Sequence, residues 1–177
     1  MKTFISAVIL SLNVLIFSSV ASAQVNYSQL GVRAGNRSIG LMARFYSDKS
    51  NGAIENLMML DYAGRDFSIT TIYEQHIMIP SVKGLSFYTG AGGHAGYYCV
   101  PRNNDLNIIT QDMADQVKPA IYNKPYIIYW GIDAIGGIDY HFPKSAVHIS
   151  ADIKPGMSLN TNTLQIFNSA IKLGIDL

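Results

Sequence analysis

Charged residues are scarce in this sequence of 177 residues, of which Asp, Glu, Lys and Arg make up 14%. A typical soluble domain has roughly 25%. Lys2 is the only charged residue before Gln24, so the chain from residue 24 onwards carries 12 basic and 12 acidic groups. Such a chain lacks the basic surface of a nucleic-acid-binding protein and the charge of a disordered tail. We expect a folded protein that does not bind nucleic acid.

Features that would hold a cofactor or a metal are also missing. The single cysteine, Cys99, excludes an internal disulfide and a Cys-rich metal site. The four histidines show no metal-ligand spacing such as i, i+4. A Gly-rich run at 90–96 continues into Tyr97 and Tyr98, without the helix that a dinucleotide-binding motif requires. We therefore expect no cofactor, no metal and no catalytic residue.

The first 23 residues have the pattern of an export signal. Lys2 supplies a positive start, residues 4–20 are mostly apolar, and 21–23 (ASA) form a small-x-small cleavage site. Ser and Asn interruptions weaken the alternative, a membrane anchor. We expect a signal peptide at 1–23, cleaved after Ala23, and one exported domain at 24–177. No later run approaches the 18 or so apolar residues of a transmembrane helix.

Alternation of apolar and polar residues dominates the rest of the chain. It is plain at 39–45, 67–74, 147–154 and 171–177. A helix repeats every 3.6 residues and cannot place such a pattern on one face, whereas a strand does so automatically. Helical periodicity is nearly absent, so the pattern predicts an all-β protein.

Turn signals divide the alternating segments into eight predicted strands. A polar connection at about 99–125 is much longer than the other turns. The predicted strands are Ser28–Ala34, Ser38–Tyr46, Ala53–Tyr62, Phe67–Ile77, Leu85–Tyr98, Tyr126–Phe142, Ala146–Leu159 and Phe167–Leu177. Eight strands of about ten residues fit an antiparallel up-and-down transmembrane β-barrel. An even strand number places both termini on the periplasmic side and the 99–125 connection outside.

The same alternation predicts which charged residues point into the barrel. They lie on the face opposite the apolar residues, and a buried charge must be paired and hydrogen-bonded. The predicted interior charges are Arg33, Arg44, Glu55, Asp61, Glu74, Asp133, Asp139, Asp152, Lys154 and Lys172. We expect them to form a polar plug rather than a pore, because eight strands leave room only for side chains.

Aromatic residues near the strand ends are expected to form the girdles of a membrane barrel. They are Tyr46, Tyr62, Tyr88, Tyr97, Tyr98, Tyr126, Trp130, Tyr140 and Phe142.

Four segments occur in a recognisable order: 52–55 (GAIE), 85–98 (LSFYTGAGGHAGYY), 131–143 (GIDAIGGIDYHFP) and 152–155 (DIKP). Together they resemble the small eight-stranded outer-membrane β-barrel domain proteins of Gram-negative bacteria. The resemblance implies an outer-membrane location, contact with outer-membrane lipid, and folding by the barrel-assembly machinery. Family members usually end in an aromatic residue, whereas this chain ends in Leu177. Most members have no assigned activity.

Three functions fit this architecture. The first is a structural or surface-interaction barrel without enzymatic activity, whose extracellular partner would bind at 99–125. The second is a soluble periplasmic barrel that binds an apolar ligand, although that class places apolar residues inside. The third is an outer-membrane lipid-modifying enzyme, suggested by the spacing of His148 and Ser150, since a base must reach a nucleophile's hydroxyl. Asp152 and Lys154 share their face, which predicts that the pair points inward, away from lipid. We favour the first function.

Overall fold

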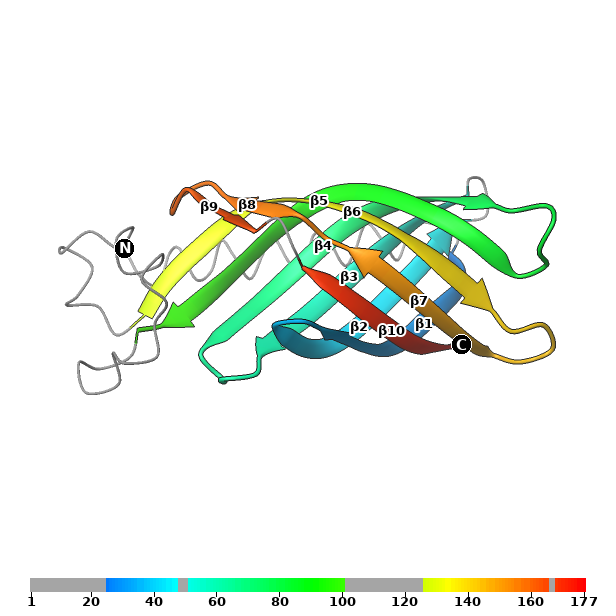
Figure 1. Ribbon diagram of the computed structural model, residues 1–177, viewed down its shortest axis with the longest axis horizontal. Helices are drawn as coiled ribbons and strands as arrows, with labels where there is room; N and C mark the ends of the chain where they lie inside the picture. Colours follow the sequence, from blue (N-terminus) through cyan, green and yellow to red (C-terminus); the bar gives the residue numbers. More distant parts are fainter. Residues whose placement is uncertain (1–24, 48–50, 101–125, 166–167) are drawn as a thin grey trace.

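The computed structural model describes residues 25–47, 51–100, 126–165 and 168–177. Most of them lie in strands that tilt across the long axis of a barrel (Figure 1). The strands are β1 (Val25–Gly35), β2 (Ser38–Ser47), β3 (Gly52–Asp61), β4 (Asp66–Met78), β5 (Leu85–Cys99), β6 (Tyr126–His141), β7 (Val147–Ile153), β8 (Gly156–Ser158), β9 (Thr163–Gln165) and β10 (Ser169–Asp176).

The strands form one closed antiparallel sheet. Neighbours follow the order β5-β4-β3-β2-β1-β10-β7-β6, and pairing of β5 with β6 closes the ring. The β7–β8 segment occupies one position around the ring and the β9–β10 segment another, so the barrel has eight strand positions. The predicted fold class, an all-β eight-stranded antiparallel barrel, is confirmed. Closure pairs the two strands that would otherwise be the edges of the sheet.

The seventh predicted strand, Ala146–Leu159, is interrupted. β7 pairs with residues 136–141 of β6 and β8 pairs with residues 131–133. Between them, Pro155 has no backbone N–H to donate, although its carbonyl still accepts a hydrogen bond from the N–H of Ala134 at 2.9 Å. The last predicted strand also differs, because β10 begins at Ser169 and the short strand β9 pairs with β8.

The barrel has two distinct ends. The C-terminal rim carries the C-terminus and the turns at 79–84 and 142–146. The opposite rim carries the turns at 36–37, 62–65 and 159–162, on the left in Figure 1. β5 ends and β6 begins at this opposite rim, and the long connection predicted at 99–125 lies, apart from its first two residues, outside the described residues.

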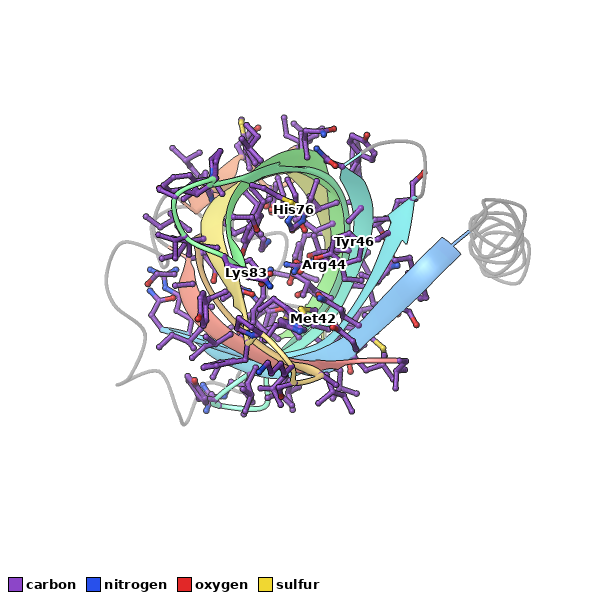
Figure 2. The ribbon with its side chains drawn as sticks, turned by 90° about the vertical axis from the view of Figure 1, so that its right-hand side faces the viewer. Met42, Arg44, Tyr46, His76 and Lys83 are labelled. Carbon is purple, nitrogen blue, oxygen red and sulfur yellow. The ribbon has the colours of Figure 1, made fainter. Side chains whose placement is uncertain are left out.

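Side chains alternate between an apolar outside and a polar inside. Figure 2 looks along the barrel, with Met42, Arg44, Tyr46 and His76 inside the ring. The outer surface carries exposed aliphatic side chains: Leu30, Val32, Ile39, Leu41, Met58, Leu60, Ile69, Ile77, Ile128, Ile132, Ile138, Ile149, Ile153, Ile171, Leu173 and Ile175. Charged side chains instead lie among the most deeply buried described residues. This polarity is the reverse of that of a water-soluble protein.

Inward-facing glycines make room for large inward side chains on neighbouring strands. A Cβ added at Gly137 would lie 2.6 Å from the ring of Tyr88, and one at Gly174 would lie 2.3 Å from the ring of His148. Tyr88 pairs with Gly137 and His148 with Gly174 on the adjacent strand, so each of these two rings lies over a position that has no side chain.

This packing predicts different effects for two adjacent glycines. Gly137→Ala would force the new methyl group against Tyr88 and the carbonyl oxygen of Ala151, so we expect a loss of about 1–3 kcal/mol in the free energy of unfolding. Gly136→Ala is the matched control, because a Cβ at that position meets no atom within 4 Å. Urea unfolding of the two variants in detergent micelles measures the difference. Equal unfolding midpoints would contradict the packing argument.

Candidate functional site

One network of side chains crosses the interior, and it takes one residue from each of the eight strand positions. Its members are three cations, four carboxylates and one phenol, all buried. They are Arg33 of β1, Arg44 of β2, Glu55 of β3, Glu74 of β4, Tyr88 of β5, Asp139 of β6, Asp152 of β7 and Lys172 of β10.

Arg44 lies at the centre of one half of this network (Figure 2). Its guanidinium nitrogens lie 2.8 Å from a Glu55 oxygen and 2.9 Å from a Glu74 oxygen. A third contact, of 3.5 Å, reaches Asp139. Arg44 Nη2 donates a hydrogen bond to Glu55, and the contacts with Glu74 and Asp139 are ion pairs, so one guanidinium faces carboxylates from three different strands.

Lys172 and Arg33 complete the other half. Lys172 Nζ donates to both oxygens of Glu55, at 2.7 and 2.6 Å, and lies 3.2 Å from Asp152. Asp152 also accepts a hydrogen bond of 2.6 Å from Arg33. Tyr88 lies between the two halves, with its hydroxyl 3.4 Å from Lys172 Nζ and the guanidinium carbon of Arg44 5.1 Å from its ring centroid. Each buried charge therefore faces a group of opposite sign, as burial requires.

A cavity of about 550 Å³ lies at the opposite rim. Exposed residues of the turns, including Arg37, Tyr62 and Ala63, form its mouth. The buried residues Thr70 and Lys154 lie deeper in its wall. The interior thus contains a polar network and, at one end, a space large enough for a small molecule.

A second hydrogen-bonded chain lies in the wall of this cavity. His94 of β5 lines the cavity, and its Nδ1 lies 2.8 Å from a carboxylate oxygen of Asp133 on β6. The other ring nitrogen, Nε2, lies 3.1 Å from Ser158 Oγ on β8. Lys154 Nζ contacts the second Asp133 oxygen at 2.9 Å. We call Ser158, His94 and Asp133 the serine relay.

The His148 and Ser150 pair does not form such a chain. Both side chains are buried inside the barrel. Ser150 donates its hydroxyl hydrogen directly to Asp139, and neither ring nitrogen of His148 has a hydrogen-bond partner. The pair therefore lacks the contact between nucleophile and base that the spacing suggested.

Nine of the ten predicted interior charges are buried inside the barrel; Asp61 is the exception. Asp61 is half-buried at the opposite rim, where it lines the cavity and its carboxylate accepts the backbone N–H groups of Arg65 at 2.6 Å and Asp66 at 2.8 Å. It therefore stabilises the β3–β4 turn rather than joining the ion pairs.

Three of the predicted girdle residues were assigned to the wrong face. Tyr46 and Tyr88 are buried inside the barrel, and Tyr98 lines the cavity. Their positions alternate in phase with Arg44 and His94, so strand parity could have placed them correctly. Tyr62, Tyr97, Tyr126, Trp130 and Phe142 are exposed.

Among the described residues, no helix is long and apolar enough to cross a membrane, and no group of three or more His, Cys, Asp or Glu is suited to a metal ion. No protein-family model matches the sequence, and no curated protein does.

The fold does have a solved counterpart. The chain is similar to the crystal structure of the N-terminal β-barrel domain of Pseudomonas aeruginosa OprF, with a TM-score of 0.58. The match covers 85% of this chain and 96% of that domain, at 12% sequence identity. The two share a fold. This likeness supports the barrel architecture and says nothing about individual side chains.

The ion-pair network predicts a large cost for removing one cation. Lys172→Met would leave Glu55 and Asp152 short of a buried partner, and we expect a loss of about 3–5 kcal/mol in the free energy of unfolding. Lys83→Met is the control, because Lys83 is exposed in the turn at 79–84 and should change stability by about 0.5 kcal/mol or less. Denaturant titrations followed by Trp130 fluorescence compare the two. A similar small effect for both would contradict the role assigned to Lys172.

Proposed function

We propose that the protein is an integral outer-membrane β-barrel with a structural or surface-interaction role. The observation that carries this proposal is the reversed polarity of the closed barrel. Exposed aliphatic side chains surround it, while charged side chains such as Arg44 and Glu55 are fully buried. Lipid tails solvate an apolar surface, and pairing of β5 with β6 closes the ring of long strands that faces them.

The interior network supports a barrel without an open pore. Ion pairs such as Arg44–Asp139, between β2 and β6, and Lys172–Glu55, between β10 and β3, cross the lumen between strands that are not neighbours. A soluble barrel that binds an apolar ligand, the main alternative, would need an apolar lumen, and this lumen is charged at its centre. The lipid-modifying alternative loses its support because His148 and Ser150 face inward and no hydrogen bond joins them.

The remaining parts of the proposal concern export and partners. We propose that residues 1–23 direct export and are removed after Ala23, and that the barrel-assembly machinery folds residues 24–177 into the outer membrane. An extracellular partner would bind at 99–125, the longest connection between strands. The structural role requires no cofactor and no catalysis.

Trp130 tests the membrane location directly. It is the only tryptophan of the sequence, and the residue is 52% exposed on the outside of β6. In vesicles containing lipids with brominated acyl chains, we expect strong quenching of its fluorescence, and a band that runs faster without boiling in detergent electrophoresis. A protein found in the soluble periplasmic fraction, without quenching or a heat shift, would contradict the proposal and favour the soluble ligand-binding barrel.

An arginine on the outer surface provides a second test. Leu173 is exposed in the middle of β10, beside Val32 and Ile149 on the neighbouring strands. Leu173→Arg should cost about 2–4 kcal/mol in the free energy of unfolding from lipid vesicles, because the charge would enter the hydrocarbon. Val82→Arg, in the turn at 79–84, is the control and should change little. In a barrel surrounded by water the two substitutions would have similar effects.

A further inference from the structure

The serine relay goes beyond the structural role proposed above. Its three residues come from three strands, and the distances are 3.1 Å from Ser158 Oγ to His94 Nε2 and 2.8 Å from His94 Nδ1 to Asp133. A nucleophile within hydrogen-bond reach of a base, which is in turn held by a carboxylate, is the arrangement of a serine hydrolase. A buried hydroxyl with only a structural role needs one hydrogen-bond partner of any kind. It does not need a histidine that is itself hydrogen-bonded to a carboxylate.

The surroundings hold the relay in this geometry. A Cβ added at Gly131 would lie 2.8 Å from the His94 ring, and one at Gly156 would lie 2.2 Å from an Asp133 oxygen, so the two glycines leave room for the base and the carboxylate. Lys154 contacts the Asp133 oxygen that His94 does not use. Asp133 is therefore fixed from both sides, and it orients the imidazole toward Ser158.

The cavity reaches the relay at His94. His94 lines it, whereas Ser158 lies against His94 and is 3% exposed. A volume of about 550 Å³ is in the range of small-molecule sites. Its mouth is at the opposite rim, among exposed turn residues, so a substrate would enter from water rather than from lipid.

We propose that Ser158, with His94 as its base and Asp133 as a positioning residue, hydrolyses small water-soluble esters that enter this cavity. This proposal replaces the expectation that the protein has no catalytic residue. It does not depend on His148 and Ser150, whose spacing in the sequence suggested catalysis.

The reaction follows from the positions of the groups. Ser158 Oγ forms a bond to the ester carbonyl carbon while its proton passes to His94 Nε2. The bond from that carbon to the alcohol oxygen breaks, and the alcohol leaves with the proton from Nε2. Water then attacks the acyl-serine and gives one proton to Nε2, which returns it to Ser158 Oγ as the acid leaves. In the overall reaction, one ester and one water give one acid and one alcohol.

Diisopropyl fluorophosphate tests the nucleophile without requiring the natural substrate. The full chain, folded in detergent micelles and recognised by its heat-shifted band, is treated with the reagent and mapped by mass spectrometry of peptides. We expect a bond from Ser158 Oγ to phosphorus, with loss of hydrogen fluoride, at least about 100-fold faster than at Ser150, which lacks a base. Absence of a Ser158 adduct on the folded protein, or equal labelling of Ser150, would overturn the proposal.

Variants then test the base. His94→Ala should lower the labelling rate of Ser158 about 100-fold. It should also hydrolyse p-nitrophenyl acetate no faster than Ser158→Ala, which gives the background rate. His148→Ala is the matched control, since neither ring nitrogen of His148 has a hydrogen-bond partner, and it should label at the native rate. Only protein with the heat-shifted band is compared, so loss of folding is not mistaken for loss of reactivity. Labelling of folded His94→Ala at the native rate would also overturn the proposal.

The positioning role of Asp133 has its own readout. The charged and titratable groups around His94 are Asp66, Tyr129, Asp133 and Lys154. Asp133→Asn removes the carboxylate that stabilises the imidazolium, so the midpoint of the pH–rate profile for labelling should move to lower pH. An unchanged midpoint in the folded variant would show that Asp133 does not act through His94, and would remove it from the proposed mechanism.

Discussion

Pairing of buried charge is the constraint on which this barrel depends. Arg44, Lys172 and Arg33 lie inside a sheet whose outer face is aliphatic, and each contacts at least one carboxylate from another strand. Leaving one such charge unpaired would cost several kcal/mol. Because every strand position contributes one member, the network links all the walls of the barrel at once.

The same network makes the strand register specific. Side chains alternate between the two faces of a strand, so a shift of one residue would exchange all inward and outward groups of that strand. In β10 such a shift would move Lys172 to the outer surface and bring Ile171 or Leu173 among the carboxylates. The hydrophobic surface and the ionic interior therefore favour the same register, and agreement between two independent terms is typical of a well-specified fold.

The alternation of apolar and polar residues predicts which face of each long strand points inward. It therefore also predicts the fold class and the charged residues at the centre of the barrel. Prediction failed where the outcome depends on neighbours distant in sequence. Pro155 interrupts a strand whose alternation continues on both sides of it, and β9 is too short to show a period. For Tyr88 the reason is local: its place near a strand end predicts a girdle residue, whereas its parity with His94 places it inside, where it is buried. The serine relay joins residues 39 and 64 positions apart, which only the register of β5, β6 and β8 brings together.

The two serine sites show how one physical requirement leads to different chemistry. Ser150 and Ser158 are both buried hydroxyls that must find hydrogen-bond partners. Ser150 gives its hydrogen to the Asp139 carboxylate, and this arrangement leaves no base to accept it during an attack. At Ser158 a histidine stands between hydroxyl and carboxylate, and that histidine lines the cavity. The position of the imidazole, more than the identity of the serine, therefore decides where the interior can do chemistry.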